Sequence, residues 1–214
     1  MQILDLFPTP IGVTQIKCDD SELEFLKSLP NSNIQDISNN GLNYDFVLKN
    51  KELKSLRECI LKEANDFARN QLAIAGNLVF QQSWANNKTD GTGFHRHKNS
   101  LISGVYYFME EEYSKIICFD KPDQNYQCYM MEPVFDENIF GNCRFTQTQV
   151  AIPPQQYLLL LFPSYLPHGV VPRDLNNPDG LHQSIAFNLV TEDVLGHRHR
   201  LNQFNYKVIE DAYI

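Results

Sequence analysis

The sequence lacks a long hydrophobic run and a hydrophobic leader. Its longest apolar stretch, Tyr157–Phe162, has six residues, whereas a membrane-spanning helix needs about 20. The first residues, Met-Gln-Ile-Leu-Asp, have neither the basic start nor the apolar core of a signal peptide. We therefore expect an intracellular, cytoplasmic protein with no membrane partner.

Basic residues are in short supply as well. Lysine and arginine number 18 against 26 aspartate and glutamate residues, which gives a formal net charge of −8. A protein that binds a phosphate backbone needs basic patches that displace counterions. The acidic balance therefore argues against nucleic acid as a partner.

Cysteine is sparse, and its spacing excludes two common motifs. The closest two cysteines lie ten residues apart, so the CxxC pair of a zinc ribbon or a dithiol redox site is absent. The number of cysteines is odd, which does not suit a set of disulfides. All five are predicted to be free thiols: Cys18, Cys59, Cys118, Cys128 and Cys143.

The chain has the composition of one globular domain. Its 214 residues, 43% of them apolar and 21% charged, are enough to bury a sizeable core. Residues 1–77 are predicted to form an N-terminal strand and a helical buttress. Leucines at helical spacing predict a short helix over 20–30, and a longer apolar stripe predicts a helix over 51–72 that Gly76 ends.

From residue 78 onward the pattern changes to short strands, separated by Gly, Pro, Asn and Asp. The predicted strands are 78–84, 101–109, 115–119, 126–131, 144–150, 157–162 and 184–191. Their spacing predicts a mainly β fold with α-helices, a double-stranded β-helix (jelly roll) buttressed by the N-terminal helices. In this single domain, 1–214, residues 78–191 are the expected core and 192–214 a C-terminal extension.

Six histidines stand out in so acidic a chain. His95 and His97 are two residues apart, so on an extended strand their side chains point to the same face. His168 follows the most apolar predicted strand and lies between Pro167 and Gly169. Two ligands on one strand and a third on a distant one suit a metal site in the mouth of a jelly roll. Imidazole alone does not select among iron, zinc, copper and nickel.

Six short motifs follow one another along the chain. They are Leu6-Phe-Pro-Thr-Pro-Ile11, Ser83-Trp-Ala-Asn86, His95-x-His97, Leu101-Ile-Ser-Gly-Val-Tyr-Tyr-Phe108, Leu161-Phe-Pro-Ser-Tyr-Leu-Pro-His168 and Ser184-Ile-Ala-Phe-Asn188. In this order the chain resembles the iron(II)/2-oxoglutarate-dependent oxygenases common in marine phages and bacteria, which are relatives of the prolyl hydroxylases. If a phage encodes the protein, the expected location is the host cytoplasm.

The resemblance implies roles for the matching residues. His95, His97 and His168 would be the metal ligands, because this branch of the family has His-x-His where others have His-x-Asp or His-x-Glu. The position of Tyr107 implies a hydroxyl group that contacts a carboxylate of 2-oxoglutarate. Strand alternation puts Ser103 on the same face as Tyr107, so Ser103 is predicted to line the co-substrate site too.

The chain departs from the family pattern at the last strand. The family normally has an arginine at the position of His182, where a planar guanidinium pairs with the distal carboxylate of 2-oxoglutarate. Alternation points His182 and Ser184 inward together, so both are predicted to contact this co-substrate, His182 when protonated. Lys115, Arg144 or Arg173 could replace the arginine, or the pocket takes another co-substrate or none.

Three neutral histidines leave the full +2 charge on the metal. This charge favours an anionic co-substrate, but the same ligand set also admits zinc, which accepts three histidines and a water molecule. Iron(II) is the metal that the resemblance implies.

The predicted activity is that of a non-haem iron(II)- and 2-oxoglutarate-dependent dioxygenase that hydroxylates a peptide or protein side chain or a small molecule. Two alternatives stay open: a catalytically altered or inactive metal-binding module, and a three-histidine dioxygenase that does not use 2-oxoglutarate. A homodimer through an apolar edge strand is a further candidate. His197 and His199 have no accompanying motif and are interpreted as part of a solvated turn.

Overall fold

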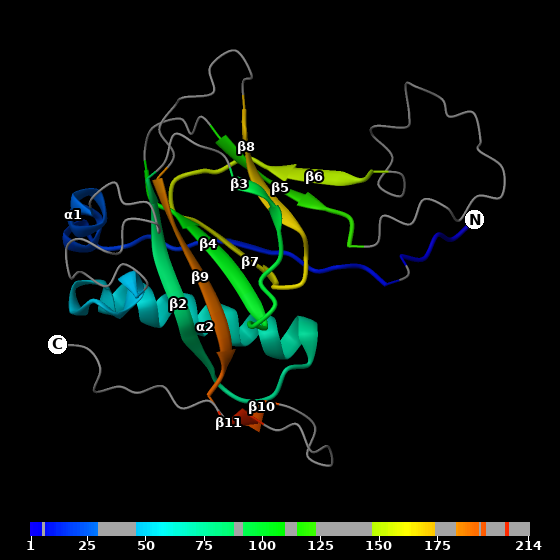
Figure 1. Cartoon of the computed structure of the whole chain (residues 1–214), viewed down its shortest axis with the longest axis horizontal. Helices are drawn as coiled ribbons and strands as arrows, with labels where there is room; N and C mark the ends of the chain where they lie inside the picture. The colour runs from blue at the N-terminus through cyan, green and yellow to red at the C-terminus, as the bar shows by residue number, and fades with distance from the viewer. Residues whose placement is uncertain are drawn as a thin grey trace.

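Two antiparallel β-sheets pack against each other and form the body of the molecule (Figure 1). The computed structural model describes residues 1–5, 7–29, 46–87, 92–109, 115–122, 147–173 and 183–192, and the backbone of 194–195 and 204–205. The larger sheet has the order β1 (Gly12–Gln15), β7 (Leu158–Pro163), β4 (Ile102–Tyr107), β9 (Gln183–Thr191), β2 (Leu78–Asn87). The smaller sheet has the order β3 (Thr92–His95), β8 (His168–Pro172), β5 (Lys115–Asp120), β6 (Gln149–Ile152). This is the predicted jelly-roll arrangement.

The strand bounds differ from the predicted ones in places. β2 runs on to Asn87, three residues beyond its predicted end, because its second half pairs in register with β9. β6 begins at Gln149, whereas the predicted strand began at residue 144, which lies outside the described residues, as does the predicted strand 126–131. The short strands β10 (Val194–Leu195) and β11 (Phe204–Asn205) pair with each other.

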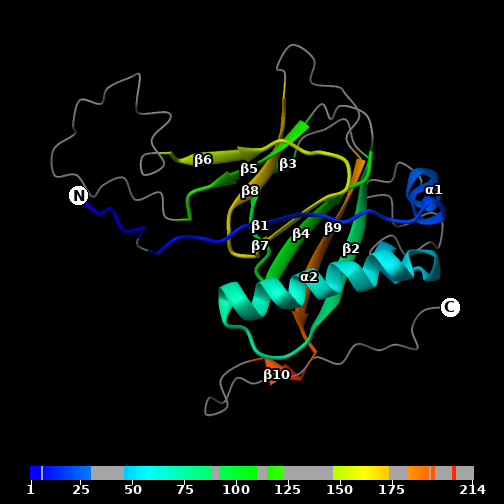
Figure 2. The same cartoon turned by 180° about the vertical axis from the view of Figure 1, so that it is seen from behind.

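Helix α2 (Lys54–Leu72) lies across the outer face of the larger sheet (Figure 2). Its buried side chains recur every three or four residues and form one apolar stripe. They are Leu56, Ile60, Ala64 and Phe67, all predicted from the sequence. A Cβ atom built on Gly12 would lie 3.0 Å from Cδ2 of Phe67, so β1 and α2 are in close contact.

Both ends of α2 differ from the prediction. Two 3-10 turns, Val47–Lys49 and Lys51–Leu53, precede it, so the α-helix begins three residues later than expected. It ends before Ala73, whose φ is 53°, and the N–H of Ile74 donates to the carbonyl of Ala68. The stop assigned to Gly76 was therefore wrong, since alanine takes the left-handed position that glycine usually fills.

The short helix α1 (Asp20–Ser28) is joined to α2 by a buried carboxylate. Asp19 is its N-cap. Glu22 accepts hydrogen bonds from the backbone N–H of Asp19 at 3.1 Å and from that of Leu56 at 2.8 Å. One side chain thus satisfies N–H groups at the starts of two helices.

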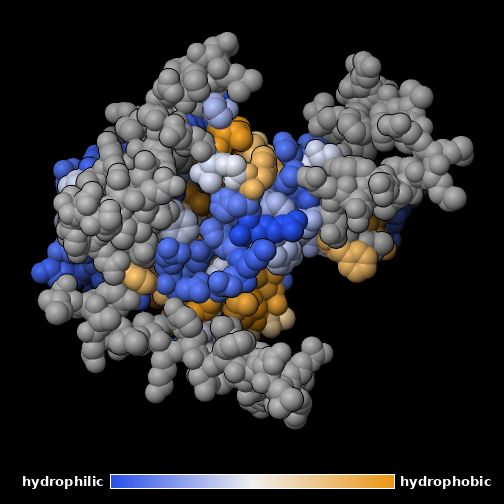
Figure 3. Space-filling view, viewed as in Figure 1, coloured by the Kyte–Doolittle hydropathy of each residue, from blue (hydrophilic) through white to orange (hydrophobic). Residues whose placement is uncertain are grey.

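The cysteines that the structure describes agree with the prediction of free thiols. Cys18, Cys59 and Cys118 are free thiols, while Cys128 and Cys143 lie outside the described residues. Among the helices that the structure describes, none has the length and apolar character needed to cross a membrane. The face seen in Figure 1 is largely hydrophilic where it is described, with smaller hydrophobic patches at its margins (Figure 3).

Candidate metal centre

Three histidines from different segments converge on one another. His95 is the last residue of β3 and pairs across the strands with His168, the first residue of β8. His97 lies two residues beyond β3. Each ring offers one nitrogen, and these three nitrogens lie within 4.8 Å of one another, which is close enough for a single metal ion to contact all of them.

His97 reaches this cluster from outside the strand. The sequence interpretation placed His95 and His97 on one strand, but β3 ends at His95. The backbone N–H of His97 donates instead to the carbonyl of Ser164, in the loop between β7 and β8, at 3.0 Å. The loop that leads to His168 therefore also fixes the backbone of His97.

Two of the rings have a defined orientation. Nδ1 of His95 lies 2.8 Å from the carbonyl oxygen of Gly93, and Nδ1 of His168 lies 2.9 Å from that of Leu166. A carbonyl oxygen can only accept, so in both rings the proton sits on Nδ1 and Nε2 keeps its lone pair. Metal-bound histidines are oriented by partners of this kind.

Burial keeps His97 and His168 neutral. Burial, with a smaller contribution from the neighbouring His95, lowers the pKa of His97 to about 4. Burial likewise lowers the pKa of His168 to about 4, although the hydrogen bond to Leu166 opposes this shift. Both imidazoles are therefore uncharged at neutral pH, which is the form that binds a metal ion.

A cavity of about 260 Å³ lies beside the histidines and has walls from both sheets. The wall residues are largely apolar or aromatic, which limits the access of water. The larger sheet contributes Trp84, Ser103, Val105, Phe162 and Ala186, and the smaller sheet contributes Thr92, Ile117 and Val170. Ser103, a predicted co-substrate residue, is thus in the cavity wall.

The next residues along the larger sheet on this side are Tyr107 and Ser184. Val105 pairs with Ala186, and Tyr107 pairs with Ser184. Because side chains alternate along a strand, Tyr107 and Ser184 share the cavity side and lie one step farther from the histidines. Both are fully buried.

The smaller sheet has a basic residue, Lys115, on its cavity side. Ile117 pairs with Val170, and Lys115 pairs with Pro172, so Lys115 shares the cavity side with Ile117. Lys115 is fully buried. Arg173 is exposed. His182, Arg144, His197 and His199 all lie outside the described residues.

A chain of polar side chains starts at His97, and the sequence predicted a role for only one of its other members, Ser103. Nδ2 of Asn188 lies 3.3 Å from Nδ1 of His97. Oδ1 of Asn188 accepts from Oγ of Ser103 at 2.8 Å, Ser103 and Ser164 contact each other at 2.9 Å, and Ser100 donates to Ser164 at 2.8 Å. Nothing in the sequence pairs Asn188 with a histidine 91 residues away.

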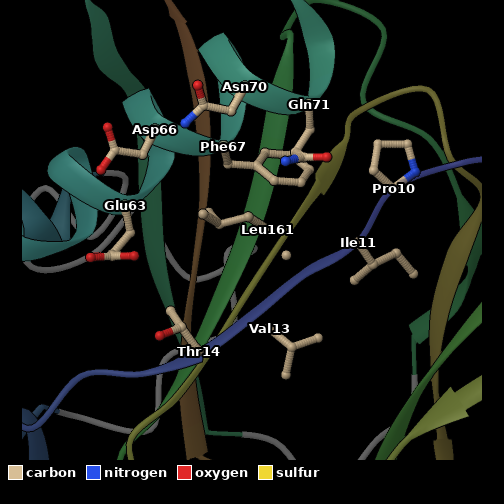
Figure 4. A pocket seen from close by; sticks show the side chains of 11 residues that line it. Pro10, Ile11, Val13, Thr14, Glu63, Asp66, Phe67, Asn70, Gln71 and Leu161 are labelled. Atoms are coloured by element: carbon tan, nitrogen blue, oxygen red, sulfur yellow. The ribbon is translucent and has the colours of Figure 1, made fainter.

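A second hollow, of about 400 Å³, lies between α2 and β1 (Figure 4). Its carboxylate and amide side chains, Glu63, Asp66, Asn70 and Gln71, all come from α2. Among the described residues, only the three histidines group closely enough to hold a metal ion. The second hollow therefore has no such group.

Comparison with protein families gives one match. Residues 82–188, half of the chain, match the model of the family described as "Putative 2OG-Fe(II) oxygenase". All three histidines, Tyr107 and Asn188 lie within this match. A comparison with curated proteins found no matching sequence.

Comparison with solved structures finds the same kind of fold. AviO1 from Streptomyces viridochromogenes Tue57 is 14% identical, with a TM-score of 0.52, over 85% of this chain and 89% of AviO1. HygX from Streptomyces hygroscopicus, solved with nickel, 2-oxoglutarate and hygromycin B, is 13% identical, with a TM-score of 0.50, over 85% of this chain and 82% of HygX.

A third match is an oxidoreductase of the 2OG-Fe(II) oxygenase family from Burkholderia pseudomallei, 10% identical over 64% of this chain, with a TM-score of 0.43. The chain spans only 57% of that protein's length. The AviO1 and HygX matches agree with the jelly-roll fold, and the family match covers the strands that bring the histidines together. This chain belongs to the 2OG-Fe(II) oxygenase family, whose members depend on iron(II) and 2-oxoglutarate.

Proposed function

We propose that this chain is an iron(II)- and 2-oxoglutarate-dependent dioxygenase whose metal is held by His95, His97 and His168. The observation that carries the proposal is the convergence of three ring nitrogens within 4.8 Å beside a cavity that both sheets line. When bound, the iron and 2-oxoglutarate supply the oxidising chemistry that hydroxylates a C–H bond of the substrate.

The ligand set supports an anionic co-substrate. The low pKa values of His97 and His168 mean that these ligands bring no charge of their own at neutral pH. A divalent ion held by neutral imidazoles keeps its whole charge, which attracts the two carboxylates of 2-oxoglutarate. Membership of the family supports iron over zinc as the resident ion.

The distal carboxylate of 2-oxoglutarate is proposed to bind at the inner end of the cavity, near Tyr107 and Ser184. His182, which lies outside the described residues, stays a proposed contact of the co-substrate. Lys115 is proposed to provide the positive charge that an arginine usually supplies. Its complete burial on the cavity side of β5 supports it over Arg173, which is exposed. An ammonium group donates as many as three hydrogen bonds and suits a buried carboxylate.

The substrate is proposed to be a small molecule or a peptide side chain that enters beside the histidines. The apolar walls formed by Val105, Ile117 and Val170 would keep water from the reacting atoms. A similar structure holds a further molecule beside the metal and the co-substrate, since the HygX structure contains hygromycin B together with nickel and 2-oxoglutarate.

An anaerobic titration with iron(II), with and without 2-oxoglutarate, tests the proposal. A weak visible charge-transfer band that needs both components is the expected result. Since loss of an outer partner of a ligand already costs about 10–100-fold in metal affinity, His168→Ala should lose more than that. His197→Ala, a histidine that the resemblance leaves unassigned, is the matched control and should keep the affinity of the unsubstituted protein.

The other outcomes identify the alternatives. Metal binding without the band would favour a three-histidine dioxygenase that does not use 2-oxoglutarate. Absence of metal binding would favour an inactive module with the same fold. Full metal affinity in His168→Ala would contradict the proposed ligand set.

The role of Lys115 has its own test in the same titration. Lys115→Met removes the charge and keeps the length of the side chain, so we expect unchanged iron affinity and a weakened dependence of the band on 2-oxoglutarate. Lys115→Arg should restore part of this dependence. An unchanged dependence in Lys115→Met would leave His182 as the proposed anchor.

A further inference from the structure

We propose that Asn188 is a positioning residue that decides which nitrogen of His97 carries the ring proton, and that it thereby tunes metal affinity. This inference rests on the metal site of the proposed function. The observation behind it is that the three histidines do not have equivalent partners. Backbone carbonyls orient His95 and His168, whereas a side-chain amide faces His97.

The amide presents the end that does not suit a histidine that binds a metal through Nε2. Nδ2 of Asn188, which only donates, lies 3.3 Å from Nδ1 of His97. Two N–H groups cannot face each other in a hydrogen bond, so in this arrangement Nδ1 is bare and the proton sits on Nε2. A ring that binds a metal through Nε2 needs the opposite arrangement, with the proton on Nδ1.

The serine hydroxyls form hydrogen bonds that match the amide in this orientation. Oδ1 of Asn188 accepts from Ser103 at 2.8 Å, so the one acceptor of the amide is already used. Ser103 in turn contacts Ser164 at 2.9 Å, and either hydroxyl can be the donor. Ser103, Ser164 and Asn188 are all buried, so bulk water does not replace these contacts.

A half-turn of the Asn188 amide reverses the whole chain of bonds without losing a contact. Nδ1–H of His97 would donate to Oδ1, and Nδ2 would donate to Ser103. Because a hydroxyl both donates and accepts, Ser103 would then donate to Ser164 and Ser164 to Ser100. Ser100 would end the chain on the carbonyl of His97, which lies 3.5 Å from its hydroxyl. Metal binding at His97 is therefore coupled to the direction of this chain.

The position of the ring protons tests the inference directly. In ¹⁵N NMR of the full chain stripped of metal, we expect His97 to carry its proton on Nε2 and His95 and His168 to carry theirs on Nδ1. After addition of Zn(II) as a diamagnetic probe, His97 should carry its proton on Nδ1, while the other two rings stay unchanged. A proton on Nδ1 of His97 both before and after Zn(II) would overturn the coupling.

Two substitutions at one position separate positioning from packing. Asn188→Asp provides two acceptors, so Ser103 and Nδ1–H of His97 can both donate to it, and Zn(II) should bind at least as tightly as in the unsubstituted protein. Asn188→Leu keeps the volume but orients neither group, so Zn(II) affinity should fall about 10–100-fold. Asn86→Leu, the same change at another cavity residue that bonds to Trp84 and Ser184, should keep the affinity.

The outcomes also distinguish this inference from the proposed function. The positioning role would be overturned if Asn188→Leu bound Zn(II) as tightly as the unsubstituted protein. It would also be overturned if Asn188→Leu and a folded Asn188→Asp protein bound Zn(II) equally tightly. If the unsubstituted protein bound no metal, the proposed function would fail, but the proton positions would still decide the inference. The Asn188→Asp protein stripped of metal should carry the His97 proton on Nδ1. A proton on Nε2 of His97 in this variant would overturn the inference.

Discussion

At the scale of single residues, Gly104 shows how closely the larger sheet is packed on its outer face. A Cβ atom at this position would overlap the ring of Phe187 and lie 2.9 Å from the carbonyl oxygen of Leu160. Phe187 has no room to retreat, because it is fully buried and stacks edge-on against Phe80 at 5.4 Å. Only hydrogen fits between β4 and this ring.

Gly104→Ala is therefore expected to destabilise the protein by about 1–3 kcal/mol, the usual cost of adding a methyl group to a filled core. Urea unfolding followed by circular dichroism measures the change. Gly93→Ala is the matched control, because a Cβ atom at Gly93 meets nothing within 4 Å. Equal unfolding midpoints for the two variants would contradict the packing argument.

The candidate ligands were predictable at this scale, and their partners were not. His-x-His and the histidine after Phe-Pro-Ser are local patterns that can be read within a few residues. The contacts of Asn188 with His97 and of Ser103 with Ser164 join residues 91 and 61 positions apart. The spacing of residues along the chain does not predict such contacts, because they form only when β4, β7 and β9 lie side by side.

At the scale of secondary-structure elements, Glu22 joins α1 to α2. It is 3% exposed, and its carboxylate accepts from the N–H groups of Asp19 and Leu56. Helical spacing put Leu23, Leu26 and Leu29 on one side of α1 but gave no role to a charged residue beside them. The reason is tertiary: the partner N–H group belongs to a helix 34 residues away.

Glu22→Ala should leave a buried N–H group of Leu56 without its acceptor, which costs about 1–3 kcal/mol. Glu22→Gln keeps one acceptor oxygen and should therefore lose less stability than Glu22→Ala. Thermal unfolding compares both with Glu24→Ala, whose side chain is 78% exposed on the same helix and should change little. An effect of Glu22→Ala no larger than that of Glu24→Ala would disprove the junction.

The end of α2 gives a prediction of opposite sign. Ala73 has a φ of 53°, a conformation that costs a residue with a Cβ atom about 1–2 kcal/mol. Ala73→Gly relieves this strain but increases the entropy of the unfolded chain, so a net gain of up to about 1 kcal/mol is expected. Ala75→Gly, two residues on and without a positive φ, should lower stability slightly, and calorimetry would show both shifts. A lower stability for Ala73→Gly would rule out strain at this residue.

At the scale of the whole molecule, the proposed metal joins parts that are separate in the sheet. Among the described strands, β3 pairs with β8 alone and so lies at the edge of the smaller sheet. His97 extends beyond β3 to the β7–β8 loop. An ion bound to His95, His97 and His168 would tie the edge strand, the loop and β8 together. Metal should then stabilise the fold and not only the site.

Zn(II) or anaerobic Fe(II) at 100 times the dissociation constant is expected to raise the free energy of unfolding by about 2.7 kcal/mol. Differential scanning calorimetry should show the midpoint rising with metal concentration in the unsubstituted protein and in His197→Ala. No such rise is expected in His168→Ala. A rise of equal size in that variant would mean that the metal binds elsewhere.

The quaternary structure and the division into segments stay predictions. Phe7 is 95% exposed, and Tyr165 and Val150 are about half exposed, so apolar side chains are available on the surface. Light scattering at several protein concentrations would show whether the predicted homodimer forms.

The unequal support of the three histidines has an evolutionary consequence. Main-chain carbonyls orient His95 and His168, and no substitution at Gly93 or Leu166 removes a carbonyl. His97 depends on a side chain, so a single base change at codon 188 can replace its partner. The metal affinity of the site can therefore change through one substitution at position 188. Substitutions at the positions that orient the other two ligands do not change it in this way.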